Sequence, residues 1–108
     1  MDAIVVTKEN FETEVKGAEL PVIVDFWAPW CGYCRRLMPV VDRLTKAYDG
    51  KAIIAKANVD DLPDLQREYA VNTIPTLILF KDGVGGVPLV NPPSMVAIAQ
   101  WLKEQGVE

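Results

Sequence analysis

The 108 residues predict one α/β domain, residues 1–108, with helices on both faces of a sheet. Segments with strand character alternate with segments of helical periodicity along the whole chain. The central strand, Leu20–Trp27, is an almost continuous apolar run, which implies burial on both faces as in parallel sheets. Half of the residues are hydrophobic and the length is typical of one domain, so the chain can bury a core.

The elements in the first half of the chain are predicted from helix-capping residues and from the spacing of apolar residues. Ile4–Val6 reads as a short strand, and Thr7 can cap a helix that carries Phe11 and Val15 on one face. A longer helix follows Cys31 and ends at Asp49-Gly50. Pro39 should kink this helix, whose apolar positions recur every three or four residues: Leu37, Val41, Leu44 and Tyr48.

The next elements are a strand and a short helix. Ala52–Val59 is the strand. Asp60-Asp61 can cap a helix that has Pro63 in its first turn and runs to about Ala70.

A hairpin and a final helix complete the chain. Thr76–Phe80 is a buried strand, Lys81-Asp82-Gly83 a hairpin turn, and Gly86–Val90 the returning strand. Pro88 lies within that last strand and places it at an edge of the sheet. Ser94 caps the final helix, whose inward positions are Met95, Ile98, Ala99 and Leu102.

Both cysteines of the chain lie in Trp30-Cys31-Gly32-Tyr33-Cys34, between the central strand and the long helix. A C-x-x-C motif in this place is typical of a redox dithiol. Three residues along a helix bring two Cβ atoms to roughly 5–6 Å, close to the roughly 3.5–4.5 Å of a disulfide. Cys31 is the predicted nucleophile, because unpaired N–H groups and the macrodipole at a helix N-terminus favour a thiolate. Cys34, one turn further, is the predicted resolving thiol.

Two other interpretations of the cysteine pair are an inert buried pair and half of a zinc site. The position at a helix N-terminus is activating, which speaks against inert cysteines. Tetrahedral zinc needs four ligands, and the chain has no histidine and no third cysteine, so only a dimer could complete such a site. We predict no metal.

Asp25 is unusual within the apolar strand. A carboxyl buried there would have a raised pKa and could exchange protons with a thiol; alternatively, it faces water at the strand end. Lys56 lies in the next predicted strand and could supply the opposite charge to Asp25, or its amine could extend to the surface.

Two further features point to the substrate surface. Pro75, in Thr73-Ile74-Pro75-Thr76, removes a backbone donor just before a buried strand and leaves an opening in the pairing. Most X–Pro bonds are trans, with only about 5–6% cis, so trans is the expectation from the residues. Trp30, beside the nucleophile, is a candidate to contact substrate.

Charge and hydropathy exclude several functions. A net charge of −4 with interspersed signs argues against nucleic acid or an anionic membrane as partner. No apolar run approaches the roughly 20 residues of a membrane span, and the first residues do not resemble a signal peptide. Because both thiols lie in one motif, none is left for a structural disulfide, which fits the reducing cytoplasm.

Over nearly its whole length the chain resembles the thioredoxin family. The resemblance is carried by Val24-Asp25-Phe26-Trp27-Ala28-Pro29-Trp30-Cys31-Gly32-Tyr33-Cys34, Pro39, Lys56, Asp60, Ile74-Pro75-Thr76 and Phe80-Lys81-Asp82-Gly83. It implies a central mixed sheet of five strands flanked by four helices. It also implies a cis Ile74–Pro75 bond packed against the dithiol, and an Asp25 that helps to deprotonate Cys34, with Lys56 beside it.

Two positions depart from the family pattern. Tyr33 stands where thioredoxins usually carry proline; it restores a backbone N–H and is expected to give a less reducing couple, or else to be a neutral exposed spacer. Asn91, in Val90-Asn91-Pro92-Pro93, stands where a glycine is usual, in a loop that normally helps to form the substrate surface.

The expected activity is therefore the reduction of protein disulfides through Cys31 and Cys34. The substrate chain would be held by Trp30, the backbone around Ile74 and the Asn91 loop, within a surface predicted to comprise Trp30, Gly32, Tyr33, Thr73, Ile74, Pro75 and Asn91. The chain is expected to bind no cofactor, to receive electrons from a separate thioredoxin-reductase-like donor, and to be a monomer. Two alternatives stay open: a protein disulfide oxidant or isomerase, and a thioredoxin-like binding module with an idle dithiol.

Overall fold

The structure is a computed structural model that describes residues 2–108. Within these described residues, six strands form one mixed sheet in the order β1-β3-β2-β4-β5, with β6 also paired to β4. The elements are β1 (Ile4–Val5), η1 (Phe11–Lys16), β2 (Val22–Trp27), α1 (Gly32–Ala47), β3 (Ile53–Asn58), α2 (Pro63–Glu68), β4 (Thr76–Lys81), β5 (Val84–Gly85), β6 (Leu89–Val90) and α3 (Met95–Glu104).

The sheet is parallel in its first part and antiparallel in its second. β1 and β2 both run parallel to β3, which lies between them, whereas β4 runs antiparallel to β2. The turn between β4 and β5 uses Asp82 and Gly83, both with positive φ, as a two-residue hairpin of the primed type requires. The mixed sheet and four helices implied by the family resemblance are confirmed.

The last strand is split, so the sheet has six strands rather than five. Pairing of Leu77 with Leu89 and of Phe80 with Gly85 leaves one extra residue on the returning strand, which is a β-bulge. The prediction that Pro88 lies inside a strand is wrong, because Pro88 falls between β5 and β6. Because Pro88 has no N–H, it cannot donate to the hydrogen-bond ladder of the sheet. The carbonyl of the neighbouring Val87 instead accepts a hydrogen bond from Trp101 Nε1 at 3.0 Å.

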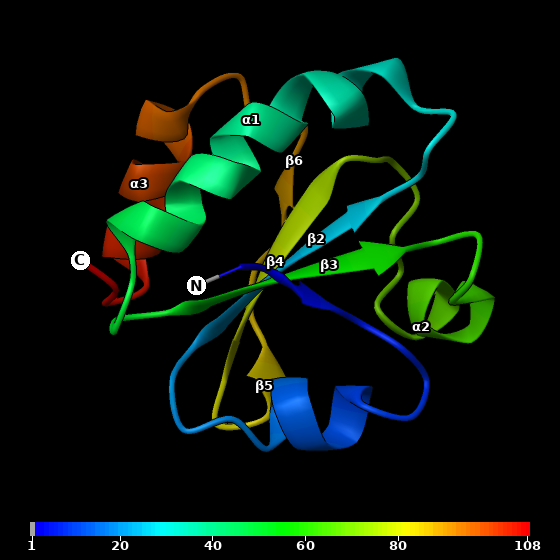
Figure 1. Ribbon diagram of the computed structural model, residues 1–108, viewed down its shortest axis with the longest axis horizontal. Coiled ribbons are helices and arrows are strands. Elements are labelled where there is room, and N and C mark those ends of the chain that lie inside the picture. Colours follow the sequence, from blue (N-terminus) through cyan, green and yellow to red (C-terminus); the bar gives the residue numbers. More distant parts are fainter. Residues whose placement is uncertain (1) are drawn as a thin grey trace.

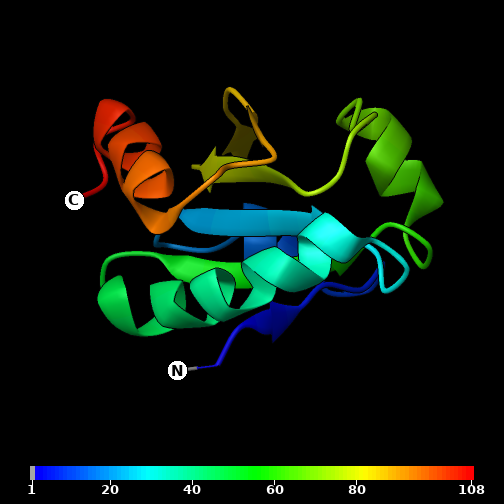
Figure 2. The ribbon, with the colours of Figure 1, turned by 90° about the horizontal axis from the view of Figure 1, so that it is seen from above.

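The helices cover both faces of the sheet. In Figure 1, α1 lies above the strands with α3 next to it at the upper left, and the helix η1 lies below the strands. α1 and α3 cover the same face of the sheet, and in Figure 2 the strand β2 is seen between them. The apolar residues of β2 alternate between the two resulting cores: Ile23 packs with α1 and α3, whereas Val24 and Phe26 pack with η1 and the region of α2. Among residues 2–108 no helix has the length and apolar character needed to cross a bilayer.

The predicted long helix is confirmed as α1, which buries Leu37, Val41 and Leu44 and continues through Pro39. Tyr48 follows its last turn and is buried too, and the turn after it includes Gly50 at φ +79°. The helix therefore begins at the dithiol and ends at the opposite end of the sheet.

Two of the predicted caps are not the cap residues in the structure. The cap position of η1 is Asn10 and not Thr7, although Thr7 and Asn10 exchange hydrogen bonds in the turn before the helix, from Asn10 N to Thr7 Oγ1 at 3.1 Å and from Thr7 N to Asn10 Oδ1 at 2.8 Å. The prediction that Asp60-Asp61 cap α2 is wrong: the cap position is Leu62, with no side-chain bond, although Pro63 is the first helical residue as predicted. The Asp60 carboxylate is instead bound to Trp30.

Ser94 caps α3, because its Oγ accepts a hydrogen bond from Ala97 N at 3.2 Å. We expect Ser94→Ala to lower the free energy of unfolding by about 1 kcal/mol, since a first-turn N–H loses its partner. Urea denaturation followed by tryptophan fluorescence measures this change. Ser94→Asp, which keeps an acceptor, is the control, and an alanine variant as stable as the aspartate variant would contradict the assignment.

Candidate functional site

Cys31 and Cys34 lie where β2 leads into α1. Cys31 is the N-cap of the helix, with an extended backbone, and the two cysteines are joined by a disulfide with Cα atoms 5.2 Å apart. Cys31 is 7% exposed and Cys34 is fully buried. Cys31 is therefore the more accessible of the two cysteines.

A backbone N–H of the first helical turn is bonded to the Cys31 sulfur. Cys34 N donates to Cys31 Sγ at 3.1 Å, in the manner of an N-cap. A thiolate there gains from this hydrogen bond and from the positive end of the helix dipole. The carbonyl oxygen of Ile74 lies 3.9 Å from the same sulfur.

The Ile74–Pro75 bond is cis, as the family resemblance implies and unlike the trans form that is commoner for X–Pro bonds. Pro75 is buried, and its carbonyl accepts a hydrogen bond from Asn91 N at 2.7 Å. Thr73 precedes this bond, is exposed, and accepts a hydrogen bond from Thr76 Oγ1 through its carbonyl. The segment before β4 and the loop after β6 thus form one wall next to the dithiol.

Asn91 has a left-handed backbone, with φ +46°. This is the conformation for which glycine is favoured and which asparagine tolerates better than most other residues. The departure from the usual glycine therefore keeps the backbone shape and adds an exposed amide to the surface.

Asp25 lies near the end of β2 and is 1% exposed, so the alternative that it faces water is excluded. Neither of its carboxylate oxygens has a hydrogen-bond partner among residues 2–108. Burial raises the pKa of Asp25 to about 7, and the positive charge of Lys56 opposes part of this rise. At neutral pH the carboxyl can therefore both take up and release a proton.

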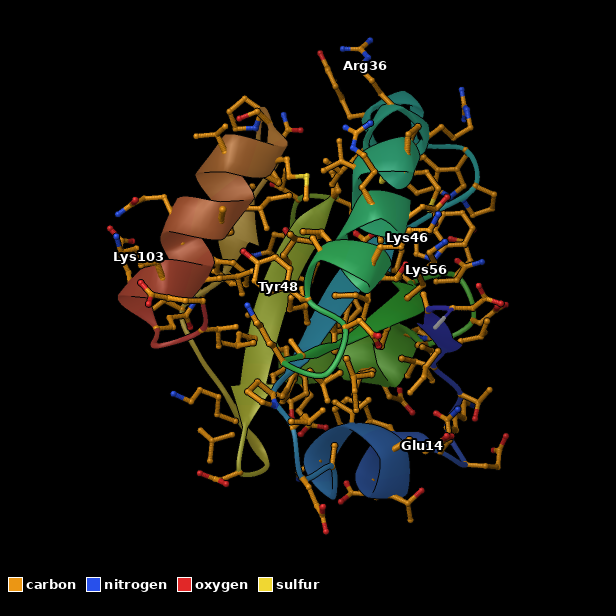
Figure 3. All side chains as sticks on the ribbon, turned by 60° about the vertical axis from the view of Figure 1, so that its left-hand side comes forward. Glu14, Arg36, Lys46, Tyr48, Lys56 and Lys103 are labelled. Carbon is orange, nitrogen blue, oxygen red and sulfur yellow. A yellow bond between two sulfur atoms is a disulfide. The ribbon has the colours of Figure 1, made fainter. Side chains whose placement is uncertain are left out.

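Lys56 is the β3 neighbour of Asp25 in the parallel register, but its amine binds another carboxylate. Its Nζ lies 3.1 Å from Asp42 Oδ1 on α1, at the surface (Figure 3). The charge of Lys56 lowers the pKa of Asp25 by less than burial raises it. Asp42 carries no sequence signal for its pairing with Lys56, since the pairing depends on how α1 crosses β3.

Trp30 is 67% exposed, immediately before the nucleophile. Its indole Nε1 donates to both carboxylate oxygens of Asp60, each at 3.1 Å. Asp60, which was predicted to cap a helix, therefore holds the indole of Trp30 in place, with its large apolar face beside the dithiol.

Gly32 is the first residue of α1, between the cysteines, and Tyr33 follows it with 58% of its surface exposed. The guanidinium of Arg36 lies over the Tyr33 ring, 5.1 Å from its centroid.

Two hollows adjoin the site. One, of about 310 Å³, is lined by Tyr33, Arg36, Leu37, Val40, Asn91, Pro92 and Pro93. The other, of about 220 Å³, is lined by Tyr69, Ala70, Val71, Asn72, Thr73, Thr76, Pro88 and Val90.

The structure thus brings most of the predicted site residues to one end of the sheet. Asp25 is buried in β2, below this surface. Lys56 is the exception, because its amine is held by Asp42 on the flank of α1. Within residues 2–108 no three side chains of the kinds that ligate metals gather in one place.

Comparison with known proteins gives a consistent result. The family model described as "Thioredoxin" matches residues 2–104. The chain is 46% identical over 89 residues to "Thioredoxin 1" of Nostoc sp., an overlap of 77% of this chain and 83% of that protein. It is 46% identical over 89 residues to "Thioredoxin" of Porphyra purpurea, with the same two shares. It is 43% identical over 93 residues to "Thioredoxin M5, chloroplastic" of Oryza sativa subsp. japonica.

The rice relative is longer than this chain. The match covers 81% of this chain and 54% of the rice protein, so the chain spans about half of that relative's length.

Proposed function

This chain belongs to the thioredoxin family of protein-disulfide oxidoreductases, and we propose that Cys31 is its nucleophile, Cys34 its resolving thiol and Asp25 the proton acceptor. It reduces protein disulfides through the Cys31–Cys34 dithiol. The observation that supports these roles is the asymmetry of the pair: Cys31 is the N-cap of α1 and keeps 7% of its surface exposed, whereas Cys34 lies inside the helix with none exposed.

In the first step, the Cys31 thiolate attacks one sulfur of a substrate disulfide. A bond forms between Cys31 Sγ and that sulfur, the substrate S–S bond breaks, and the second substrate sulfur leaves as a thiolate. The N–H of Cys34 and the dipole of α1 stabilise the attacking thiolate.

In the second step, Cys34 attacks Cys31 Sγ, and the mixed disulfide breaks. The Cys31–Cys34 disulfide forms, and the remaining substrate sulfur leaves as the second thiol of the reduced product. Cys34 must lose its proton first. The Asp25 carboxylate is suited to accept it, because its pKa of about 7 matches the pH of the cell interior.

The substrate chain would lie across the surface formed by Trp30, Gly32, Tyr33, Thr73, Ile74, Pro75 and Asn91. The Ile74 carbonyl faces the reactive sulfur and can pair with the substrate backbone near its cysteine. Trp30, held by Asp60, offers an apolar face beside that backbone. Lys56 acts indirectly: its positive charge limits how far burial raises the pKa of Asp25.

The partners follow from the chemistry. Each turnover leaves a disulfide, so a separate thioredoxin-reductase-like protein must return two electrons, and the chain itself holds no cofactor in this scheme. The substrates are proteins with accessible disulfides. We place the domain in the reducing cytoplasm, because both cysteines lie in the redox motif and none is left for a structural bridge. The monomeric state is the expectation from the family.

Reduction of insulin with dithiothreitol as electron source tests the assignment. We expect the wild-type chain to accelerate precipitation of the insulin B chain, and Cys31→Ser to lower the rate to the dithiothreitol background, since no nucleophile remains. Ser94→Ala is the matched control for a folding defect. A Cys31→Ser variant that keeps most of the activity would overturn the role given to Cys31.

A further inference from the structure

The two positions at which the sequence departs from the family pattern lie in one groove. Tyr33 comes from the start of α1, and Asn91-Pro92-Pro93 come from the loop between β6 and α3, yet all line the hollow of about 310 Å³. Tyr33 lies between the two cysteines in sequence, so this groove opens beside the dithiol.

The lining of the groove is mixed: four apolar side chains lie beside the polar groups of Tyr33 and Asn91 and one charge. Its walls include Leu37, Val40, Pro92 and Pro93, and Arg36 is the single charged side chain among the described lining residues. The Arg36 guanidinium is placed over the Tyr33 ring and projects from the N-terminal end of α1 (Figure 3). Arg35, the next residue toward the cysteines, adds a second positive charge and is tied to the Pro29 carbonyl at 2.8 Å.

We propose that this groove binds the part of a substrate protein next to its reactive cysteine, and that Arg36 selects a substrate segment that carries acidic side chains. The proposal rests on the proposed function and specifies its substrate class. Arg36 is exposed, so water partly screens an ion pair formed there, and a carboxylate on the substrate segment gains a modest amount from its charge. Tyr33, in place of the usual proline, supplies the ring that fixes the guanidinium at the rim.

Two disulfide-closed peptides test the proposal. They share one sequence, except that two residues flanking the cysteines are Glu in one peptide and Lys in the other. We expect the wild-type chain to reduce the acidic peptide with a kcat/KM about three- to fivefold higher than the basic one, the range of a partly exposed ion pair. The preference should shrink as salt is raised toward 1 M, where the Debye length is about 3 Å.

Variants of α1 assign the preference to Arg36. Arg36→Gln is expected to bring the ratio of the two kcat/KM values close to one, and Arg36→Glu to invert it. Arg43→Glu is the matched control, because Arg43 is exposed on the same helix, lies outside the groove and produces the same change in net charge. Using a ratio removes any general effect of the variants on the reactivity of the thiols.

Three results would contradict different parts of this account. Equal reduction of both peptides by the wild-type chain would overturn the proposal while leaving disulfide reduction intact. Equal effects of Arg36→Glu and Arg43→Glu would assign the preference to net charge and overturn the role of the groove. Failure of the wild-type chain to reduce either peptide or insulin would overturn the proposed function itself, and this inference with it.

Discussion

A Cys34→Ser variant is expected to accumulate a covalent complex with substrate proteins through Cys31. The first attack remains intact, because Cys31 keeps its place at the N-terminus of α1. The second attack is lost, because serine cannot displace the substrate thiolate from Cys31 Sγ. Steady-state reduction should fall by about a hundredfold or more, since a tethered thiol is replaced by slow attack from solution. Non-reducing electrophoresis and mass spectrometry detect the complex, and dithiothreitol should release it.

The Cys31→Ser variant and the double Cys31→Ser/Cys34→Ser variant are the controls. Neither should form the complex, because the buried Cys34 cannot reach a protein disulfide while α1 is folded. Complexes formed by Cys31→Ser but not by Cys34→Ser would reverse the assignment of the two sulfurs.

The stability of the oxidised protein is expected to fall as the pH rises from about 4 to about 7, through the titration of Asp25. Burial raises the pKa of this carboxyl from 3.8 to about 7. Between these values the unfolded chain has lost the proton and the folded chain retains it, so a rise in pH favours unfolding. The contribution is fully present below pH 4 and gone above about pH 7, and it amounts to roughly 4 kcal/mol, since the pKa rises by about three units at about 1.4 kcal/mol per unit.

Asp25→Asn should remove this pH dependence. The variant is expected to be as stable as the wild type near pH 4 and more stable by roughly 2–4 kcal/mol at pH 8, where the wild type must bury a charge. Urea denaturation across this range, followed by tryptophan fluorescence, measures both proteins. The same variant should slow the release of substrate from the mixed disulfide. A variant with the same pH slope as the wild type would show that Asp25 titrates normally.

The sequence was sufficient for the parts of the fold that depend on local pattern. The continuous apolar run of β2 and the regular apolar spacing of α1 each permit one structure, and the motif between them places the dithiol at their junction. For Asp25 the sequence left two alternatives, a buried carboxyl and one that faces water at the end of the strand. Alternation along a strand gives the face on which a side chain lies, but not how deeply the end of the strand is buried in the protein.

The features that could not be predicted depend on which elements meet. Asp60 has the residue type of a helix cap, but in the folded chain the indole of Trp30 competes for its carboxylate. Lys56 is opposite Asp25 in register, yet α1 places Asp42 within 3.1 Å of its amine. The groove that joins Tyr33 to Asn91 is likewise formed by segments far apart in the sequence.

The reduction potential of the Cys31–Cys34 pair tests most directly whether this chain is a disulfide reductase. It can be measured by equilibration with thiol–disulfide buffers, with tryptophan fluorescence as the probe. We predict a value nearer to the roughly −270 mV of thioredoxin than to the roughly −180 mV of protein disulfide isomerase, even with Tyr33 in place of proline. A potential at or above roughly −180 mV would instead identify an oxidant or isomerase. The absence of any reversible couple would contradict a redox role for the dithiol.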